Sequence, residues 1–547
     1  MAGVPAGWRA AEGQVPLLNL MQRQILDQID AGRSNQELAE RLDLPLQAAK
    51  EQVSELLSLL GFFSREEMAD FWAWHRSRKP RLGRLGIGSL LRPRWIGPAA
   101  ALGGGLAVAV ALPLIRASGS DKPIAVTSEA ATPAAVASLP PSLSLRAEQM
   151  PLPASGPEGN FAYLNEAGDL MVKPMPSGQP QVVRRANGLR SPRWSSSGNY
   201  LAVVENGTLT VLDRSGKLTS VAQIQNDRTW EWSPKEDQLV VFTGDGMWLF
   251  DPTSGTKTVL RGQGAPLPES PSALFWSPDG TRVLYQLSWS VTAPGRDATS
   301  EMRIFDLRTG QDRLLVSQKT PPQGGTIPVG WSGDAEWVYY REAPFYGASV
   351  WVDGVSLMAM PSAGGVATKV GTLLGVDEFS SIGPGERVAF VDGAGRFAGE
   401  SEKHVAVAAG NVRVSVATGG WDAEAAWSPD ASSLVVVRMP APAEKTAGGA
   451  PELAAYAGRK LWLETSSESR QLTSDPAFRD EHPMWSRDGR AVVFVRLDGQ
   501  QRASIWRVAT GGGSPTKLED GLGLGERGAF GTYGWIDWDE LMDWWQP

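Results

Sequence analysis

Few side chains in this sequence combine the types and the spacing that catalysis or metal binding requires. The 547 residues include no cysteine, which excludes disulfides, thiolate metal sites and a cysteine nucleophile. Histidine occurs only at His75, His404 and His482, and no carboxylate or third histidine lies at a ligand-like spacing from the last two. No Gly-x-Ser-x-Gly motif of a serine hydrolase is present. We therefore predict that the protein is not an enzyme and has no catalytic residue, no bound metal and no cofactor.

Tryptophan, aspartate and glycine instead recur together in one short motif, of which "ALFWSPDGTRVLYQ" at residues 273–286 is one copy. Its aspartates and glycines, Asp279, Gly280, Asp488 and Gly489 among them, raise the question of calcium binding. A calcium loop requires a dense series of oxygen ligands, which no copy has. Ser-Pro-Asp-Gly is typical of a tight turn, so we predict that these residues shape turns.

Copies of the motif occur only in the C-terminal part of the chain. A degenerate seventh copy has Ile382 at the tryptophan position. The tryptophans of the other six copies are Trp194, Trp232, Trp276, Trp331, Trp427 and Trp485. The copies lie 38 to 58 residues apart, which is the period of a four-stranded propeller blade with loops of variable length. In each unit the tryptophan ends an inner strand, the turn follows, and an alternating apolar run returns beside it. Because each sheet buries its faces only against neighbouring sheets, the units must stack into a ring.

The number of blades depends on how the ring closes. Residues 161–183 supply about three strands without an inner one, and "YGWIDWDELMDWW" at residues 533–545 provides a candidate for it. We favour an eight-bladed ring closed by strands from both ends of the region, with seven blades as the alternative. The units resemble the WD40-like repeats of the TolB-type β-propeller over roughly residues 158–545, which implies the propeller fold. Exposed tryptophans such as Trp351 or Trp421 are candidates for a recognition surface.

The N-terminal residues show helical periodicity. Apolar residues with helical spacing form three runs, which are Ile25, Leu26 and Ile29, then Leu38, Ala39 and Leu42, then Ala49, Val53, Leu56, Leu57 and Leu60. Gly32 can end the first helix, Ser34 and Glu37 can form a capping box for the second, and Pro45 suits the start of the third. Short helices joined by tight turns predict a helix-turn-helix domain over residues 1–75.

Residues 31–61, "AGRSNQELAERLDLPLQAAKEQVSELLSLLG", resemble the LuxR-type DNA-binding domain. The positions that match its pattern are Gly32, Ser34, Asn35, Glu37, Leu38, Ala39, Leu42, Leu44, Lys50, Leu60 and Gly61. The resemblance implies that the third helix binds DNA, with Gln47, Lys50 and Gln52 as the contacting residues.

The charge of this region is unfavourable for DNA binding. Residues 16–75 hold five Lys/Arg against ten Asp/Glu, whereas phosphate contacts by cations supply most non-specific affinity for DNA. The sequence also departs from the LuxR pattern, since Ala48, Ala49 and Gln52 stand where threonine, valine and histidine are usual. Two alternatives follow, namely DNA binding or a degenerate helix-turn-helix that binds a protein partner.

An uncharged segment separates the helical and the repeat regions. Residues 95–115 carry no charge, and 21 helical residues cover about 30 Å, the thickness of a bilayer core. The basic segment 76–94 precedes them, so the positive-inside rule predicts a single transmembrane helix with a cytoplasmic N-terminus and an exported C-terminal region. One face of this helix carries small residues that would allow two copies to form a homodimer, namely Gly97, Ala101, Gly105 and Ala109.

Residues 116–157 are rich in proline, alanine and serine and predict an extended linker, which leaves residues 158–547 for the propeller. The predicted fold class is a multidomain chain with a small all-α helix-turn-helix domain, a single transmembrane helix and a large all-β propeller. We expect a regulator in the cell membrane whose exported propeller binds an envelope ligand or protein and whose cytoplasmic domain binds DNA. The alternative is a non-enzymatic envelope scaffold protein.

Overall fold

The computed structural model describes residues 20–42, 53, 56, 65–78, 150–224, 226–262, 273–289, 299–319, 325–343, 354–376, 379–395, 401–415, 421–442, 450–525 and 533–547. They comprise a group of helices near the N-terminus and a β-propeller, and each is considered by itself. The membrane span predicted at 95–115 and most of the linker predicted at 116–157 lie outside these residues. In the part of the chain that is described, no helix has the length and apolar character needed to cross a membrane.

The N-terminal helices are α2 (Leu20–Asp30), α3 (Asn35–Leu42) and α5 (Arg65–Arg78). The turn between α2 and α3 follows the prediction, because Gly32 adopts a φ of +70°, a left-handed conformation that favours glycine at a helix end. Ser34 and Glu37 form the predicted capping box. The backbone N–H of Ser34 donates to Glu37 Oε2 at 2.8 Å, and that of Glu37 donates to Ser34 Oγ at 3.3 Å.

These helices share one apolar cluster. Its buried members are Ile25, Leu26, Ile29, Leu38, Val53, Leu56, Met68, Phe71 and Trp72. The first six belong to the three runs in which the sequence predicts helices. The remaining three belong to α5, which the apolar spacing does not predict. The Trp72 indole N–H donates to Asp27 Oδ1 of α2 at 2.8 Å, so α5 is tied to α2 by a hydrogen bond as well as by apolar contacts.

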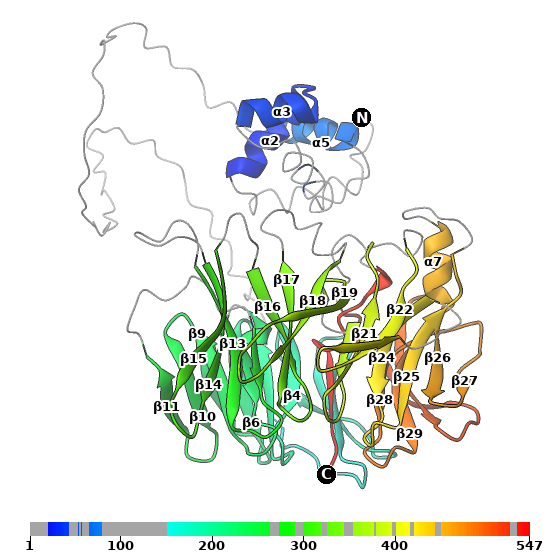
Figure 1. Ribbon diagram of the computed structural model, residues 1–547. Coiled ribbons are helices and arrows are strands. Elements are labelled where there is room, and N and C mark those ends of the chain that lie inside the picture. Colours follow the sequence, from blue (N-terminus) through cyan, green and yellow to red (C-terminus); the bar gives the residue numbers. More distant parts are fainter. Residues whose placement is uncertain are drawn as a thin grey trace, which may run out of the picture. The chain divides into compact units, whose positions relative to one another are not determined.

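From residue 160 onward the strands form four-stranded antiparallel sheets, each a blade of the propeller (Figure 1). Blade 1 contains β1 (Asn160–Leu164), β2 (Leu170–Pro174), β3 (Gln181–Arg184) and β32 (Met542–Trp545). Blade 2 contains β4 (Leu189–Trp194), β5 (Tyr200–Glu205), β6 (Thr208–Asp213) and β7 (Leu218–Gln223). The short helix η2 (Asp227–Thr229) precedes blade 3, which contains β8 (Trp230–Trp232), β9 (Leu239–Thr243), β10 (Gly246–Asp251) and β11 (Thr256–Arg261).

The next blades repeat this order. Blade 4 contains β12 (Leu274–Trp276), β13 (Arg282–Trp289), β14 (Thr299–Asp306) and β15 (Asp312–Lys319). Blade 5 contains β16 (Gly325–Trp331), β17 (Trp337–Ala343), β18 (Val355–Pro361) and β19 (Thr368–Leu373). Blade 6 contains β20 (Ser380–Ile382), β21 (Arg387–Asp392), β22 (His404–Ala409) and β23 (Val412–Ser415). Blades 5 and 6 are joined in one sheet only through the pair Leu373 and Asp392.

Two further blades complete the propeller. Blade 7 contains β24 (Trp421–Trp427), β25 (Ser433–Met439), β26 (Lys460–Thr465) and β27 (Ser469–Gln471), with helix α7 (Ala450–Ala457) between β25 and β26. Blade 8 contains β28 (Arg479–Trp485), β29 (Ala491–Leu497), β30 (Ala503–Ala509) and β31 (Thr516–Leu522). The strand pairing therefore gives the eight blades that the sequence favours.

The ring closes through blade 1. Its inner strand β32 pairs antiparallel with β1, with Asn160 opposite Trp545 and Tyr163 opposite Met542. One apolar cluster joins blades 8 and 1, and the next joins blades 1 and 2. The predicted closure by strands from both ends of the region is thus confirmed, and the inner edge of β1 is paired.

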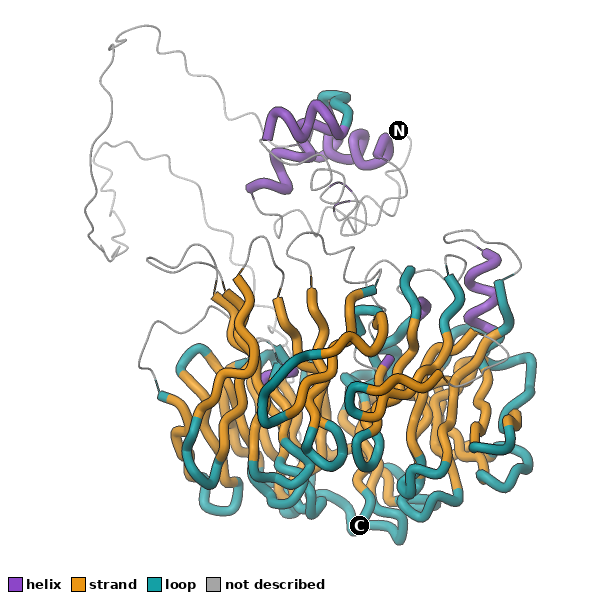
Figure 2. Tube along the Cα trace, in the orientation of Figure 1, coloured by secondary structure: helices purple, strands orange, loops and turns teal. Residues whose placement is uncertain are grey.

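The turn of the repeated motif has the predicted role. The Asp279 carboxylate accepts the backbone N–H of Thr281 at 3.0 Å, and Gly280 supplies a φ of +72°. In blade 8 the Asp488 carboxylate accepts the N–H of Arg490 at 3.0 Å in the same way. Figure 2 shows short turns in teal along the edge of the propeller opposite α7.

In four copies of the motif, the tryptophan links its blade to the preceding blade. The indole N–H groups of Trp232, Trp276, Trp331 and Trp485 donate to the carbonyls of Arg193, Glu231, Phe275 and Ala426, respectively, at 2.9 to 3.1 Å. The buried indole nitrogen of Trp194 has no hydrogen-bond partner among the described residues, and neither does that of Trp427, which follows the degenerate copy. A Cβ at Gly383, which replaces the motif's serine, would lie 2.7 Å from the Trp427 indole nitrogen.

Candidate binding pocket

The edge of the propeller that carries α7 has connections of very different length. In blades 2 and 3 the second and third strands are joined by residues 206–207 and 244–245 only. In blades 4 to 7 the corresponding connections are longer, and they comprise residues 290–298, 344–354, 393–403 and 440–459. Because long loops on a rigid scaffold commonly carry binding residues, this half of the edge is the expected location of a site.

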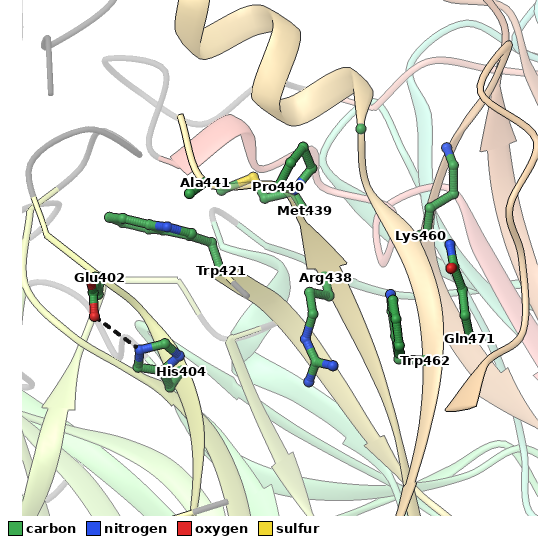
Figure 3. A pocket seen from close by; sticks show the side chains of 11 residues that line it. Glu402, His404, Trp421, Arg438, Met439, Pro440, Ala441, Lys460, Trp462 and Gln471 are labelled. Carbon is green, nitrogen blue, oxygen red and sulfur yellow. Dashed lines mark ion pairs between the residues drawn. The ribbon is translucent and has the colours of Figure 1, made fainter. Parts of the chain in front are cut away.

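A cavity of about 640 Å³ lies at this edge between blades 6 and 7 (Figure 3). Its walls combine two tryptophans with charged and polar side chains from β24, β25 and β26 of blade 7 and from the start of β22 in blade 6. The lining includes Glu402, His404, Trp421, Arg438, Lys460 and Trp462. Both the volume and the mixture of aromatic and polar groups are typical of a small-molecule site.

Arg438 is held in the cavity by two ion pairs. Its Nε donates to Asp422 Oδ1 at 2.8 Å, and its Nη2 donates to Glu464 Oε1 at 2.8 Å. All three side chains are more than nine-tenths buried. The guanidinium carbon also lies 5.1 Å from the ring centre of Trp462, within the range of a cation–π contact. The paired guanidinium therefore fixes one wall of the cavity before any ligand arrives.

The other charged groups of the lining also have partners. Lys460 Nζ donates to the carbonyl of Arg459 at 3.1 Å and to that of Phe478, and burial lowers the pKa of Lys460. On the blade 6 side, His404 Nε2 lies 3.5 Å from Glu402 Oε2, as the dashed line in Figure 3 shows. Each of these charged or ionisable side chains thus has a polar partner within the protein.

Of the two tryptophans proposed for a recognition surface, the structure describes only Trp421. Trp421 is only 7% exposed, so the expectation that it is an exposed residue is wrong. It packs into the large apolar cluster of blades 5 to 8 and contributes to the cavity wall. Trp351 lies outside the described residues. Neither Arg438 nor Lys460 was predicted from the sequence, where the available signal was a cation near the end of the largely apolar strand 433–439 and another at the start of strand 460–465.

The two histidines of the propeller lie in different blades. His404 begins β22 in blade 6, whereas His482 lies in β28 of blade 8, 3.7 Å from Asp539. Within the described residues, no group of three or more histidine, aspartate or glutamate side chains could hold a metal ion.

A second polar cluster, which the sequence analysis also missed, lies between blades 7 and 8. We call it the Glu424–Glu481 cluster. The Glu481 carboxylate accepts hydrogen bonds from Arg459 Nη1 at 3.0 Å and from Arg479 Nε at 2.5 Å. Glu424 Oε2 accepts a backbone N–H of β28 at 2.8 Å. Burial, followed by repulsion from Glu481, raises the pKa of Glu424 to about 8.

The predicted DNA-contacting residues Gln47, Lys50 and Gln52 lie outside the described residues. Val53 and Leu56 of the same predicted helix are described, and both are buried in the core shared by α2, α3 and α5. The structure therefore describes the core against which the third helix was expected to pack, but not its contact residues.

No family model and no curated protein matches this chain. Similar solved structures include TolB from Acinetobacter baumannii, with 15% identity, a TM-score of 0.31 and coverage of 68% of this chain. This chain spans 66% of the length of that TolB. A eukaryotic initiation factor has 12% identity and a TM-score of 0.44, with coverage of 70% of this chain and 90% of that one. The propeller domain of the Trilobed protease from Pyrococcus furiosus has 11% identity and a TM-score of 0.35, with coverage of 61% and 98%.

Proposed function

We propose that this chain is a membrane-tethered regulator, with an exported propeller that binds an envelope ligand or protein and a cytoplasmic helix-turn-helix domain that binds DNA. The cavity between blades 6 and 7 carries the proposal, because two tryptophans and an immobilised arginine form a preorganised binding site there. The uncharged residues 95–115 and the basic residues 76–94 support the tether in the lipid bilayer. The proposed activity is binding without catalysis.

DNA binding is supported by the LuxR-like residues. The left-handed Gly32 and the capping box of Ser34 give α2 and α3 the short connection that a helix-turn-helix requires. In the third helix expected from the sequence, Lys50 is a cation available for a phosphate, and Gln47 and Gln52 are its neighbours at a base edge. Because one such module binds weakly, specific binding should depend on two copies, paired through the small residues of the span.

The test is a salt titration of DNA binding by the full-length protein in detergent, with genomic fragments as the probe. Lys50→Ala should remove about one phosphate contact and lower the slope of log affinity against log salt by about one unit. Converting Glu51 and Glu55 to glutamine should strengthen binding, because both carboxylates repel the DNA backbone. If an artificially dimerised form of residues 1–94 and the full-length protein bind no fragment above background at low salt, the transcriptional proposal fails.

The second candidate function is an envelope scaffold whose helix-turn-helix domain holds a protein partner. It is favoured by the excess of acidic side chains in residues 16–75, where ten carboxylates oppose five cations. Crosslinking of the cytoplasmic domain in cells, followed by identification of the crosslinked species, separates the candidates. A DNA crosslink supports the regulator, and a protein crosslink without DNA supports the scaffold.

The orientation has its own test. A reporter enzyme that is active only outside the cytoplasm, fused after Pro547, should be active, because the basic segment 76–94 precedes the span. The matched control carries the same reporter before residue 20 and should be inactive. Activity of the N-terminal fusion alone would reverse the proposed orientation.

A further inference from the structure

We infer that the cavity between blades 6 and 7 binds an uncharged oligosaccharide. The inference rests on the proposed function, since it names the ligand class for the same cavity. Three properties of the cavity lead to it, namely the pairing of its charges, the surfaces of its tryptophans and the exposed carboxylate at its margin.

The first property is that the charged side chains in the described lining are already paired. Arg438 lies between two buried carboxylates, and Lys460 donates to two backbone carbonyls. His404 lies beside Glu402. A charged ligand group placed against Arg438 or Lys460 would have to break one of these contacts or remain unpaired in a partly desolvated site, and both outcomes cost free energy. The inner part of the cavity therefore selects against formal charge.

The second property is the pair of aromatic walls. Trp462, on β26, is partly exposed and presents indole surface to the cavity, whereas Trp421, on β24, is 7% exposed and contributes only a small part of its surface. Trp462 is held by the cation–π contact with Arg438, and Trp421 is fixed in the apolar cluster of blades 5 to 8. Rigid aromatic side chains provide large contact areas with little loss of conformational entropy. A sugar ring offers C–H groups on its faces, which suit such surfaces.

The third property is the polar margin. The Glu402 side chain is 72% exposed, so its carboxylate can accept hydrogen bonds from a ligand while it remains beside His404. Gln471, on β27, adds a side-chain amide to the lining. Hydroxyl groups both donate and accept hydrogen bonds, so they satisfy carboxylate, amide and guanidinium groups without introducing a charge. A purely apolar ligand would remove water from the exposed Glu402 carboxylate without offering it a hydrogen bond.

The experiment measures binding of hexasaccharides of equal length and different charge to the full-length protein in detergent, by isothermal titration calorimetry. The uncharged probes are chitohexaose, cellohexaose and maltohexaose. The charged probes are fully deacetylated chitohexaose, which is cationic, and hexagalacturonate, which is anionic. We expect at least one uncharged probe to bind, and both charged probes to bind at least tenfold more weakly than it does.

Two variants and a matched control locate the site. Trp462→Ala and Glu402→Ala should each reduce affinity at least tenfold. Because Glu402 is exposed, Glu402→Ala should not change the melting temperature. Weaker binding by this variant at an unchanged melting temperature then cannot be attributed to loss of folding. The control is Trp248→Ala in blade 3. Trp248 occupies the same position in the third strand as Trp462, opposite a valine in each case, and bears Lys257 4.3 Å from its ring centre. Its replacement should change affinity less than twofold.

Several outcomes would overturn the inference. They are binding of a charged hexasaccharide as tight as that of the uncharged ones, absence of binding by all three uncharged probes, and full affinity in both cavity variants. None of these outcomes decides the proposed function, because the DNA titration and the reporter fusions use no sugar. Failure of the ligand class and failure of the regulator are therefore distinguishable.

Discussion

Glu424 and Glu481 are buried neighbours whose surroundings favour different protonation states. Burial alone would raise the pKa of Glu481, but Arg479 and Arg459, together with the hydrogen bond from Trp538, lower it. Glu424 receives a backbone N–H, and burial beside the ionised Glu481 favours its neutral form. At neutral pH the cluster therefore holds one proton that the unfolded chain would already have released.

This proton makes stability depend on pH. The folded protein keeps this proton up to about pH 8, whereas a glutamate in the unfolded chain loses it near its ordinary pKa of 4.5. The free energy of unfolding should therefore fall as pH rises between these values. Glu424→Gln removes the titration and keeps an acceptor for the backbone N–H. Relative to wild type, its free energy of unfolding should increase by at least about 1 kcal/mol from about pH 5 to about pH 8.5, because one pKa unit corresponds to about 1.4 kcal/mol.

Urea titrations at the two pH values measure this difference. The matched control is Glu166→Gln, which changes an exposed glutamate in the turn between β1 and β2 and should show no comparable gain. If Glu424→Gln and wild type lose the same stability between the two pH values, Glu424 is ionised in the folded protein and the prediction is wrong.

Residue roles could be predicted from the sequence where the partners are close in the chain. The capping box of Ser34 and Glu37 spans three residues, and Asp279 bonds the N–H of Thr281 two residues away. The pairing of Glu424 with the strand of the next blade joins residues 58 apart. Such a contact depends on how two blades face each other, which the periodicity of one strand does not specify. The same limit explains why Arg438 and its cavity were missed.

At the scale of elements, the tryptophan that ends the inner strand positions that strand in blades 3, 4, 5 and 8. The indole N–H reaches the inner strand of the preceding blade, so the motif joins sheets as well as filling space between them. The repeat spacing predicted the strands and the turns, since both are local. It did not predict the interblade hydrogen bond, which requires the relative placement of two sheets. Helix α5 was also missed, although Met68, Phe71 and Trp72 are buried in the shared core and Ala69 and Trp74 pack against it.

The two kinds of tryptophan allow a matched comparison. Trp276→Phe removes the N–H donated to the Glu231 carbonyl at 3.0 Å, whereas Trp427→Phe removes a nitrogen that has no such bond among the described residues. Both changes shorten the side chain by a similar volume. Trp276→Phe should therefore lower the free energy of unfolding by about 1 kcal/mol more than Trp427→Phe does. Urea titrations of both variants measure the difference, and equal losses would mean that the indole hydrogen bond makes no net contribution.

At the scale of the whole propeller, residues 533–547 contribute more than a closing strand. Tyr533 packs in the apolar cluster of blades 5 to 8, and Trp538 donates to Glu481 of blade 8. The carbonyl of Glu540 accepts the N–H of Ser191 in blade 2. The segment therefore contacts several blades before β32 enters blade 1. The closure was predictable because residues 161–183 supply one strand too few, but the contacts of residues 533–541 have no repeating pattern from which to infer them.

Deletion of residues 533–547 should open the ring. It exposes the inner edge of β1 and removes partners of blades 1, 2 and 8, so the melting temperature of the propeller should fall by more than about 10 °C, with aggregation through the unpaired edge. Calorimetry and light scattering measure the two effects. Deletion of Pro547 alone is the control and should change neither. A truncated protein that melts at the wild-type temperature without aggregating would show that the ring does not need this strand.

The pairing of β1 with β32 also constrains the order of folding. Phe161 pairs with Trp544, and nearly the whole propeller sequence lies between these two residues. The contact can therefore form only after both strands and the blades between them have been synthesised. Chain-entropy costs make such distant pairings slow, and domains begin to fold as their chains emerge from the ribosome. Blades 2 to 8 can therefore stack during synthesis, while the inner edge of β1 in blade 1 remains unpaired until β32 is present. Under the proposed export of the propeller, this delay would leave the ring open until the last blade has crossed the membrane.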